Sequence, residues 1–514
     1  MQELETKYLL LPGRRPGKAL RRVLQALVWA GFQIHPKTTR HVHDVYFDTA
    51  DERLRHAGWS LRCRHRSLAL LITCKQLASA NGDFFERREV EQTTLHETPS
   101  LDTLEDGPVL ELLRRYVPAS AELVPCFRQD NERQLYVLTH RDYPRASIEM
   151  VMDQVRVSGA SPLAYIEFEG ELKQGPQSFL EEFAGVLRAE PGLIRARTSK
   201  FHRGHFNTSP LTGIGERRRE LMTPDDTWTR LAADYLQEQL EALAYYEPFA
   251  YEGLHTEGVH QMRVATRRMR AALKAFGDVL PEESARRLAA EAGWLCDVLG
   301  EVRDLDVQLE RLAQYRSQLP STRQSTLDAY ERHLKTSHQQ ARRCLVAALD
   351  GRRYTHFLNR YRGLQGEANE LIGGGPTIRD FARRELPTRL ERIRRAGRKI
   401  RPGSPPEAYH RLRIRIKKLR YGLEILEGPY GETLAGVTKA LRRLQGRLGD
   451  HQDACVAQTE LAQYRDTLAS AARERRTFDR LIAIEAERAA ELRSRFPKDW
   501  RKFDKASHEL ARIL

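Results

Sequence analysis

Charged and apolar residues alternate along several short segments in the first 170 residues of the chain. The first of these segments carries Glu3, Glu5 and Lys7, and the apolar residues 8–10 follow it. Successive side chains of a β-strand point to opposite faces, so these three charges would share one face. A single strand of this kind is often an exposed surface strand, and the meaning of the pattern depends on whether it recurs.

Five further segments show the same alternation or end in a charge after a β-prone run. Arg62 and Arg64 share a face, and so do Arg87, Glu89 and Glu91. Residues 70–75 end in Lys75, residues 148–153 end in Asp153, and residues 166–172 align Glu167, Glu169 and Glu171. Mixed clusters of acids and bases on so many strands indicate a closed antiparallel barrel, with a charged lumen and helices on its outside. One solvated face of an open sheet explains them less well.

The pattern changes from about residue 222 to apolar residues spaced three or four apart, which is typical of helices. Segments 260–270 and 410–420 repeat at about 150 residues, and each begins with His and has bases at +3, +7, +8 and +10. On a helix the His and the bases at +3, +7 and +10 share one face. We name these faces the two basic stripes: His260, Arg263, Arg267 and Arg270, and His410, Arg413, Lys417 and Arg420.

The charge of the chain is concentrated in this helical part. The chain has 514 residues and a formal net charge of +15; residues 1–206 hold 29 Lys/Arg and 27 Asp/Glu, whereas residues 207–514 hold 56 and 43. Nucleic acid, an anionic membrane surface and inorganic polyphosphate all suit such a cationic body. Because no aromatic residue stands at a stacking position of either stripe, nucleic acid is the less favoured partner. A solvated helical face remains the alternative.

Length and composition bound the remaining possibilities. A chain of 514 residues predicts two or three domains. No run of 18 apolar residues occurs, and the charged strand starts at residue 3, so we expect a cytoplasmic protein without a leader or membrane contact. The six cysteines form no Cys-x-x-Cys pair, which favours reduced thiols over zinc or disulfides.

The motifs of residues 1–206 resemble those of the CYTH family, the triphosphate tunnel metalloenzymes. The resemblance rests on the Glu-x-Glu-x-Lys of residues 3–7, Tyr-Phe-Asp-Thr at 46–49, Leu-Arg-x-Arg at 61–64, Thr-x-Lys at 73–75, the acids of 167–171 and Ser-Lys at 199–200. It implies an α+β domain built on an eight-stranded antiparallel β tunnel, in which a triphosphate is hydrolysed or transferred.

Such a tunnel needs bases for the phosphates and carboxylates for a hard divalent metal, Mg²⁺ or Mn²⁺. Arg128 and Arg133 lie on one segment, and we prefer Arg133. The expected phosphate-binding and catalytic residues are Lys7, Arg62, Arg64, Lys75, Arg87, Arg133 and Lys200. The expected metal ligands are Glu3, Glu5, Asp153, Glu167, Glu169 and Glu171.

The two basic stripes resemble the CHAD domain, which often follows a CYTH domain. We expect a linker at 207–221 and a CHAD domain at 222–512. The resemblance implies an all-α bundle of two pseudo-symmetric four-helix halves whose basic surface binds polyphosphate, and association with polyphosphate granules is a further expectation. Together with the all-phosphate partner, the lack of a clear aromatic wall favours inorganic triphosphate as substrate. The alternatives are a thiamine or nucleoside triphosphatase, a class IV adenylate cyclase, and a non-catalytic polyphosphate-binding protein.

Overall fold

The computed structural model describes residues 2–65, 70–77, 82, 84–158, 162–208, 219, 221–370, 375–401, 403–468 and 472–513. The chain forms two compact units. The first comprises Met1–Thr212 together with Pro248–His255, and the second comprises Gly213–Glu247 and Thr256–Leu514. Most of the expected linker, residues 209–218 and 220, lies outside the described residues, so the linker and the domain boundaries stay predictions.

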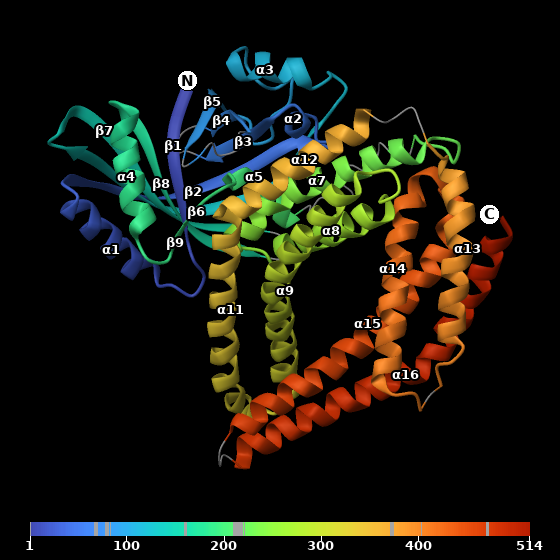
Figure 1. Cartoon of the computed structure of the whole chain (residues 1–514). Coiled ribbons are helices and arrows are strands. Elements are labelled where there is room, and N and C mark those ends of the chain that lie inside the picture. Colours follow the sequence, from blue (N-terminus) through green and yellow to red (C-terminus); the bar gives the residue numbers. More distant parts are fainter. Residues whose placement is uncertain are drawn as a thin grey trace. The chain divides into compact units, whose positions relative to one another are not determined.

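The first unit is built on an antiparallel sheet that closes on itself. Its strands follow the order β5-β4-β3-β2-β6-β7-β8-β1, pairing of β5 with β1 completes the ring, and β9 adds to β1 at one side (Figure 1). Closure leaves the ring without free edges and gives every strand an inner and an outer face. The strands are β1 Gln2–Leu10, β2 Phe32–Thr49, β3 Trp59–His65, β4 Leu70–Gln76, β5 Phe85–Thr94, β6 Leu123–His140, β7 Tyr143–Ser158, β8 Leu163–Gln174 and β9 Leu193–Arg195.

Helices cover the outer face of the ring. Tyr8 of β1 and Phe168 of β8 pack against Phe179 and Phe183 in one buried cluster, and a second cluster forms under α3. Gly170 permits the close approach of α4, because a Cβ there would lie 2.2 Å from the Phe183 ring. The helices of this unit are α1 Pro16–Trp29, α2 Arg53–His56, α3 Pro108–Tyr116, α4 Gln177–Ala189 and α5 Lys200–Thr208.

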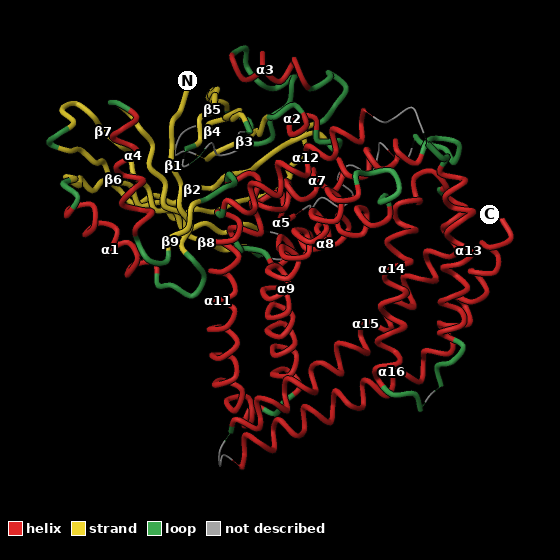
Figure 2. Tube along the Cα trace, viewed as in Figure 1, coloured by secondary structure: helices red, strands yellow, loops and turns green. Residues whose placement is uncertain are grey.

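The described part of the second unit is almost entirely helical (Figure 2). Local sequence explains several helix starts: α13 begins with a capping box of Thr377 and Asp380, and α14 begins with Pro406 at its first position. The elements are α7 Trp228–Glu252, α8 Thr256–Ala275, α9 Glu282–Gln318, α10 Ser321–Gln324, the 3₁₀ turn Ser325–Leu327, α11 Asp328–Asp350, α12 Arg352–Glu370, α13 Ile378–Gly397, α14 Pro406–Tyr430, α15 Glu432–Thr467 and α16 Ala472–Ile513.

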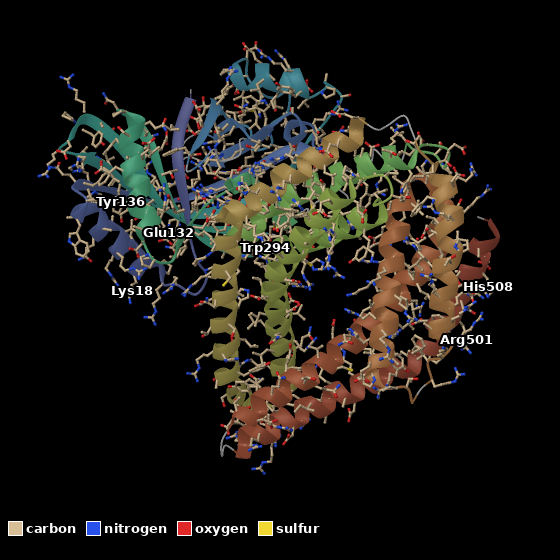
Figure 3. The ribbon with its side chains drawn as sticks, viewed as in Figure 1. Lys18, Glu132, Tyr136, Trp294, Arg501 and His508 are labelled. Carbon is tan, nitrogen blue, oxygen red and sulfur yellow. The ribbon has the colours of Figure 1, made fainter. Side chains whose placement is uncertain are left out.

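Two series of helices follow one another in the second unit. The stripe helix α8 has 20 residues and precedes the 37-residue α9, and the stripe helix α14 has 25 residues and precedes the 36-residue α15. Trp228 of α7 stacks on Phe381 of α13 with ring centroids 3.6 Å apart. Arg353 of α12 lies 4.1 Å over the ring of Trp294, the α9 residue labelled in Figure 3. These contacts join the helices of the bundle.

The expected fold class is confirmed: an eight-stranded antiparallel ring with flanking helices, followed by an all-helical region. None of the described helices is long and apolar enough to cross a bilayer.

Candidate active site

The ring of strands encloses a charged cavity of about 1000 Å³. Its lining includes nine Lys or Arg residues and six Glu residues among those that the structure describes. The alternation of β1 explains how such a wall forms, because its inner face carries Glu3, Glu5 and Lys7 while Tyr8 and Leu10 join the apolar cluster outside. The cavity can therefore hold a polyanion together with a cation.

Every base that the sequence predicted for phosphate contact lines this cavity: Lys7, Arg62, Arg64, Lys75, Arg87, Arg133 and Lys200. Arg128, the alternative to Arg133, is not part of the lining. Arg40 and Lys173 also line it, although no motif indicated them. The bases come from β1, β2, β3, β4, β5, β6, β8 and α5, so they surround the lumen.

Buried carboxylates that do not line the cavity hold several of these bases in place. Asp44 and Asp153 are at most 1% exposed, and each accepts two hydrogen bonds from one guanidinium. Arg64 donates to Asp44 at 2.7 and 2.9 Å, and Arg133 donates to Asp153 at 2.8 and 2.7 Å. Burial opposes ionisation of Asp153, but Lys200 and Arg133 hold its pKa at about 2. Glu5, 1% exposed, contacts one guanidinium nitrogen of Arg87 through a single carboxylate oxygen.

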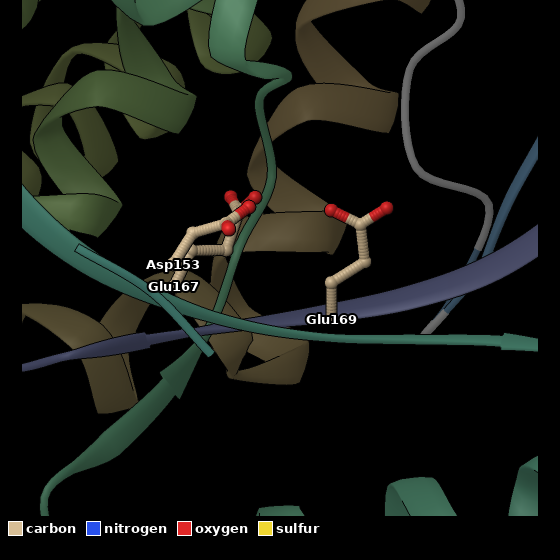
Figure 4. Close-up of side chains that lie close together, drawn as sticks. All are labelled: Asp153, Glu167 and Glu169. Carbon is tan, nitrogen blue, oxygen red and sulfur yellow. The ribbon is translucent and has the colours of Figure 1, made fainter. Parts of the chain in front are cut away.

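Lys200 fills the centre of an acidic cluster on β7 and β8. Carboxylate oxygens of Asp153, Glu167 and Glu169 lie within 4.8 Å of one another, and the three side chains project from the same side of the strands (Figure 4). Lys200 Nζ lies 2.9 Å from Asp153 and 2.9 Å from Glu169, and it also contacts Glu167. Although burial opposes it, these acids hold the pKa of Lys200 well above its usual value. The Lys200 ammonium therefore balances part of the negative charge of this cluster, and Arg133 pairs with Asp153 as well.

Two residues that no motif indicated support this cluster. Arg203, fully buried, donates to Glu167 at 2.7 and 2.5 Å and to the carbonyl oxygen of Thr198 at 2.7 Å. Glu252 belongs to the segment Pro248–His255 of the first unit and lies 3.7 Å from Arg203. Glu252 also accepts hydrogen bonds from the backbone N–H groups of Arg197 and Thr198, both at 2.7 Å. The spacing of three residues between Lys200 and Arg203 could have predicted that both side chains lie on one face of a helix. No local sequence pattern indicates Glu252.

A different set of carboxylates faces the cavity. Glu3, Glu89, Glu169 and Glu171 all line it, whereas Glu5, Asp153 and Glu167 do not. Burial raises the pKa of Glu3, and the neighbouring Glu89 raises it further. Burial also raises the pKa of Glu171, with Glu3 contributing. Lys75 pairs with Glu3 and Lys173 pairs with Glu171, so burial is the main cause of both shifts. The oxygens of these carboxylates are ligands that a hard divalent cation prefers.

Two aromatic residues line the cavity, which the sequence did not suggest. Tyr46 and Phe201 are 4% and 3% exposed. The Tyr46 ring stacks on Phe127 with centroids 4.5 Å apart, and Phe201 lies 5.7 Å from Tyr46. Because both rings are packed within this cluster, they offer little open surface on which a base could stack.

The basic stripes of the second unit lie on α8 and α14, as their spacing predicted. Burial and the charges of Arg267, Arg413 and Arg263 lower the pKa of Lys417 to about 7, so bases of both stripes lie close to one another. His410 shares a 2.7 Å hydrogen bond with Gln452 of α15, and burial lowers the pKa of His260. Arg270 is exposed, and Arg420 pairs with Glu424 at 3.3 Å. Arg267 and Arg420 lie 5.6 and 5.1 Å over the ring of Tyr421.

Comparison with known families agrees with both parts of this architecture. The CYTH domain model matches residues 1–204, and the CHAD domain model matches residues 234–462. The chain carries a CYTH domain followed by a CHAD domain. CYTH domains are those of triphosphate tunnel metalloenzymes, a class of divalent-metal-dependent hydrolases and cyclases.

The curated relatives of this CYTH–CHAD protein include two uncharacterised proteins of Mycobacterium tuberculosis, Rv2226 (strain ATCC 25618 / H37Rv) and MT2285 (strain CDC 1551 / Oshkosh). Each is 28% identical over 280 residues, which cover 53% of this chain and 52% of the relative. The alignment thus spans about half the length of the relatives.

Solved structures with similar parts include the CHAD domain from Ricinus communis, with 26% identity, a TM-score of 0.46 and coverage of 55% of this chain and 93% of that one. PptA from Streptomyces chartreusis shows 20% identity, a TM-score of 0.40 and coverage of 54% and 99%. HpAC1 from Hippeastrum, described as having a dominant triphosphatase activity, shows 19% identity, a TM-score of 0.31 and coverage of 40% and 96%.

Proposed function

We propose that the CYTH domain hydrolyses inorganic triphosphate to diphosphate and phosphate with Mg²⁺ or Mn²⁺, and that the CHAD domain binds inorganic polyphosphate. The observation that carries the proposal is the cavity of about 1000 Å³, whose described lining includes all seven predicted bases and six carboxylates. A linear chain of phosphates suits such a lumen, because bases surround it and no open aromatic face lies in it among the described residues.

The bases bind and orient the phosphate chain. Arg62, Arg64 and Arg133 can each grip two phosphate oxygens, whereas Lys7 and Lys75 act as point charges. Arg64 and Arg133 are pre-positioned by their paired hydrogen bonds to Asp44 and Asp153, so little side-chain freedom is lost when substrate binds. We assign Asp153 and Glu167 the role of holding Arg133, Lys200 and Arg203, rather than that of metal ligands.

Glu3, Glu169 and Glu171 are the residues that would hold the metal, with Glu89 beside them. When bound, the metal would supply a Lewis acid for phosphate oxygens and lower the pKa of a water nucleophile. The chain itself contributes the surrounding charge that stabilises the transferred phosphoryl group and keeps the diphosphate product in place.

Polyphosphate binding by the CHAD domain is supported by the two basic stripes. Burial and the nearby charges of Arg267, Arg413 and Arg263 lower the pKa of Lys417 to about 7. A cluster of like charges without enough counter-charge is stabilised by a polyanion, which would relieve the repulsion.

The test is phosphate release by the full-length protein from triphosphate, ATP and thiamine triphosphate, with Mg²⁺, Mn²⁺ or chelator present. We expect the highest kcat/KM with inorganic triphosphate and none with chelator. Release from no substrate would favour a non-catalytic binding protein, a higher kcat/KM for ATP or thiamine triphosphate would change the substrate, and cyclic AMP formed from ATP would identify a cyclase.

For the CHAD domain, labelled polyphosphate and single-stranded DNA of matched charge should compete, with polyphosphate retained more strongly. Arg413→Glu combined with Lys417→Glu should weaken polyphosphate binding by about tenfold or more. The control pair Arg332→Glu and Lys439→Glu changes exposed bases outside the stripes and should leave it within about threefold. Equal losses for both pairs would mean that only the overall charge matters.

A further inference from the structure

The second unit has a groove between α13 and α14, flanked by α8, that the basic stripes do not include. Its volume is about 860 Å³. We call it the α13–α14 groove. It is separate from the stripes because α14 contributes Arg411, Arg415 and Lys418 to the groove, whereas the stripe residues of the same helix lie on another face.

The floor of the α13–α14 groove is apolar. Ile393 of α13 and Leu412, Leu419 and Ile425 of α14 are at most 4% exposed and line it, and Ala396 lies half-buried beside them. Small residues in the floor leave room above it, because Gly422 has no side chain and the alanines have only a methyl group. Such a floor makes no favourable contact with a ligand made only of phosphates, but apolar side chains of a ligand would be buried against it.

Rows of bases flank this floor on both sides. On α14 they are Arg411, Arg415 and Lys418, at positions i, i+4 and i+7; on α13 and the turn after it they are Arg392, Arg395 and Lys399, at i, i+3 and i+7. All six are exposed. Within the described part of the chain no acid lines the groove, and Arg395 alone of the six forms an ion pair, with Glu391 at 2.9 Å.

The length of the groove separates a peptide from a small ligand. Its lining runs along α14 from Ala408 to Ile425, which at 1.5 Å per residue is about 25 Å. An amphipathic helix of about 17 residues has that length and presents an apolar stripe with polar residues on both sides. Acidic residues beside such a stripe would meet both rows of bases.

We propose that the α13–α14 groove binds an acidic amphipathic helix of a partner protein. Its apolar stripe would pack on Ile393, Leu412 and Leu419, and its acidic flanks would pair with the two rows of bases. Charge complementarity decides the occupant, since a second copy of this chain carries a net charge of +15 and would be repelled. The proposal does not depend on triphosphate hydrolysis or on polyphosphate binding by the stripes.

The test uses the full-length protein and a fluorescein-labelled 18-residue helical peptide with Leu on one face and Glu on its flanks, measured by anisotropy. A peptide of the same composition with the Leu residues distributed around the helix is the control ligand. We expect the amphipathic peptide to bind about 30-fold more tightly than the scrambled one, because only its apolar face matches the floor.

Variants of the rim and of the floor, with one matched control, locate the binding site. A triple rim variant should lower the affinity for the amphipathic peptide by about 30-fold; it combines Arg411→Glu, Arg415→Glu and Lys418→Glu. A charge-matched control at exposed positions outside the groove should change this affinity by less than about threefold; it combines Arg332→Glu, Lys439→Glu and Arg475→Glu. Ala396→Phe should block the floor, and Ala408→Phe at one end of the groove provides a second test if Ala396→Phe misfolds by circular dichroism.

Each of four results would overturn the proposal. The first two are equal binding of the two peptides and no binding of either. The third is unchanged peptide binding when the floor is filled. The fourth is a rim variant that loses binding of inorganic polyphosphate or anionic phospholipid vesicles but still binds the peptide. The last result would assign the groove to a phosphate ligand instead.

Discussion

Glu252 provides the sharpest test of how the tunnel is held together. It lies outside the matched CYTH segment, it is 2% exposed, and its carboxylate accepts hydrogen bonds from two backbone N–H groups and from the hydroxyl of Thr198. It is also 3.7 Å from Arg203, which holds Glu167. Through Thr198, two residues before Lys200, the carboxylate fixes the turn that places Lys200 in the acidic cluster.

Replacing this carboxylate leaves buried donors without an acceptor. Breaking a buried charged pair from one side costs about 3–5 kcal/mol. Glu252→Ala should therefore lower the local stability of residues 197–205 by about this amount, and 3 kcal/mol corresponds to about 100-fold faster amide exchange. A displacement of about 1 Å at a catalytic group can cost about 100-fold in rate, so kcat/KM should fall by a similar factor. Glu252→Gln keeps the shape and one acceptor, and we expect about a tenfold loss.

The assay combines metal-dependent phosphate release with hydrogen exchange of the full-length protein. Glu301→Ala removes an exposed acid of α9 and serves as the matched control, since it should change neither readout. Polyphosphate binding should also stay unchanged in Glu252→Ala. Wild-type turnover together with wild-type protection of residues 197–205 would refute the role given to Glu252.

Three further predictions follow from other parts of the molecule. Glu171→Gln should raise the Mg²⁺ concentration needed for half-maximal release more than it raises the KM for triphosphate, and Lys75→Met should do the reverse; identical shifts in both variants would contradict the division between ligand and phosphate contact. The pKa of Lys417 is about 7 without ligand and should rise when a polyanion binds, so binding takes up a proton and polyphosphate affinity should fall between pH 7 and 9. Lys417→Arg should flatten this dependence in a titration, and an unchanged slope would exclude Lys417 as its source. Gly170→Ala should destabilise the tunnel by about 1–3 kcal/mol in a denaturant titration, because the new methyl group meets Phe183, whereas Gly185→Ala has open space and should not; equal midpoints would argue against that close packing.

Alternation along a strand was a good guide to which face a residue occupies. It placed the bases of the strands on the lumen, because the apolar residues between them had to pack outward under α1, α3 and α4. Lys200, on α5, was predicted instead from the Ser-Lys motif. The distinction between Arg133 and Arg128 has the same origin, since an odd spacing puts them on opposite faces of β6. The basic stripes could also be predicted from the sequence, because the period of a helix determines which residues share a face.

Alternation could not predict which inner-face carboxylates are covered by neighbouring bases. Glu5, Asp153 and Glu167 lie on the inner face, as predicted, yet cross-strand bases cover them, so they do not line the cavity. Register between strands decides this, and the sequence alone gives no register. Asp44 was overlooked because its own segment lacked the alternation, although it holds Arg64. The support from Glu252 depends on a contact between residues 54 positions apart, which no local pattern encodes.

The placement of Glu252 limits how this protein can be dissected or recombined. A fragment that stops at residue 206 keeps every motif of the catalytic half but lacks Pro248–His255, which packs with that half. Weak activity of such a fragment would then report an incomplete tunnel and not a loss of substrate delivery. The same dependence predicts that exchanging the helical half for that of a relative succeeds only when the incoming chain supplies a carboxylate at this position.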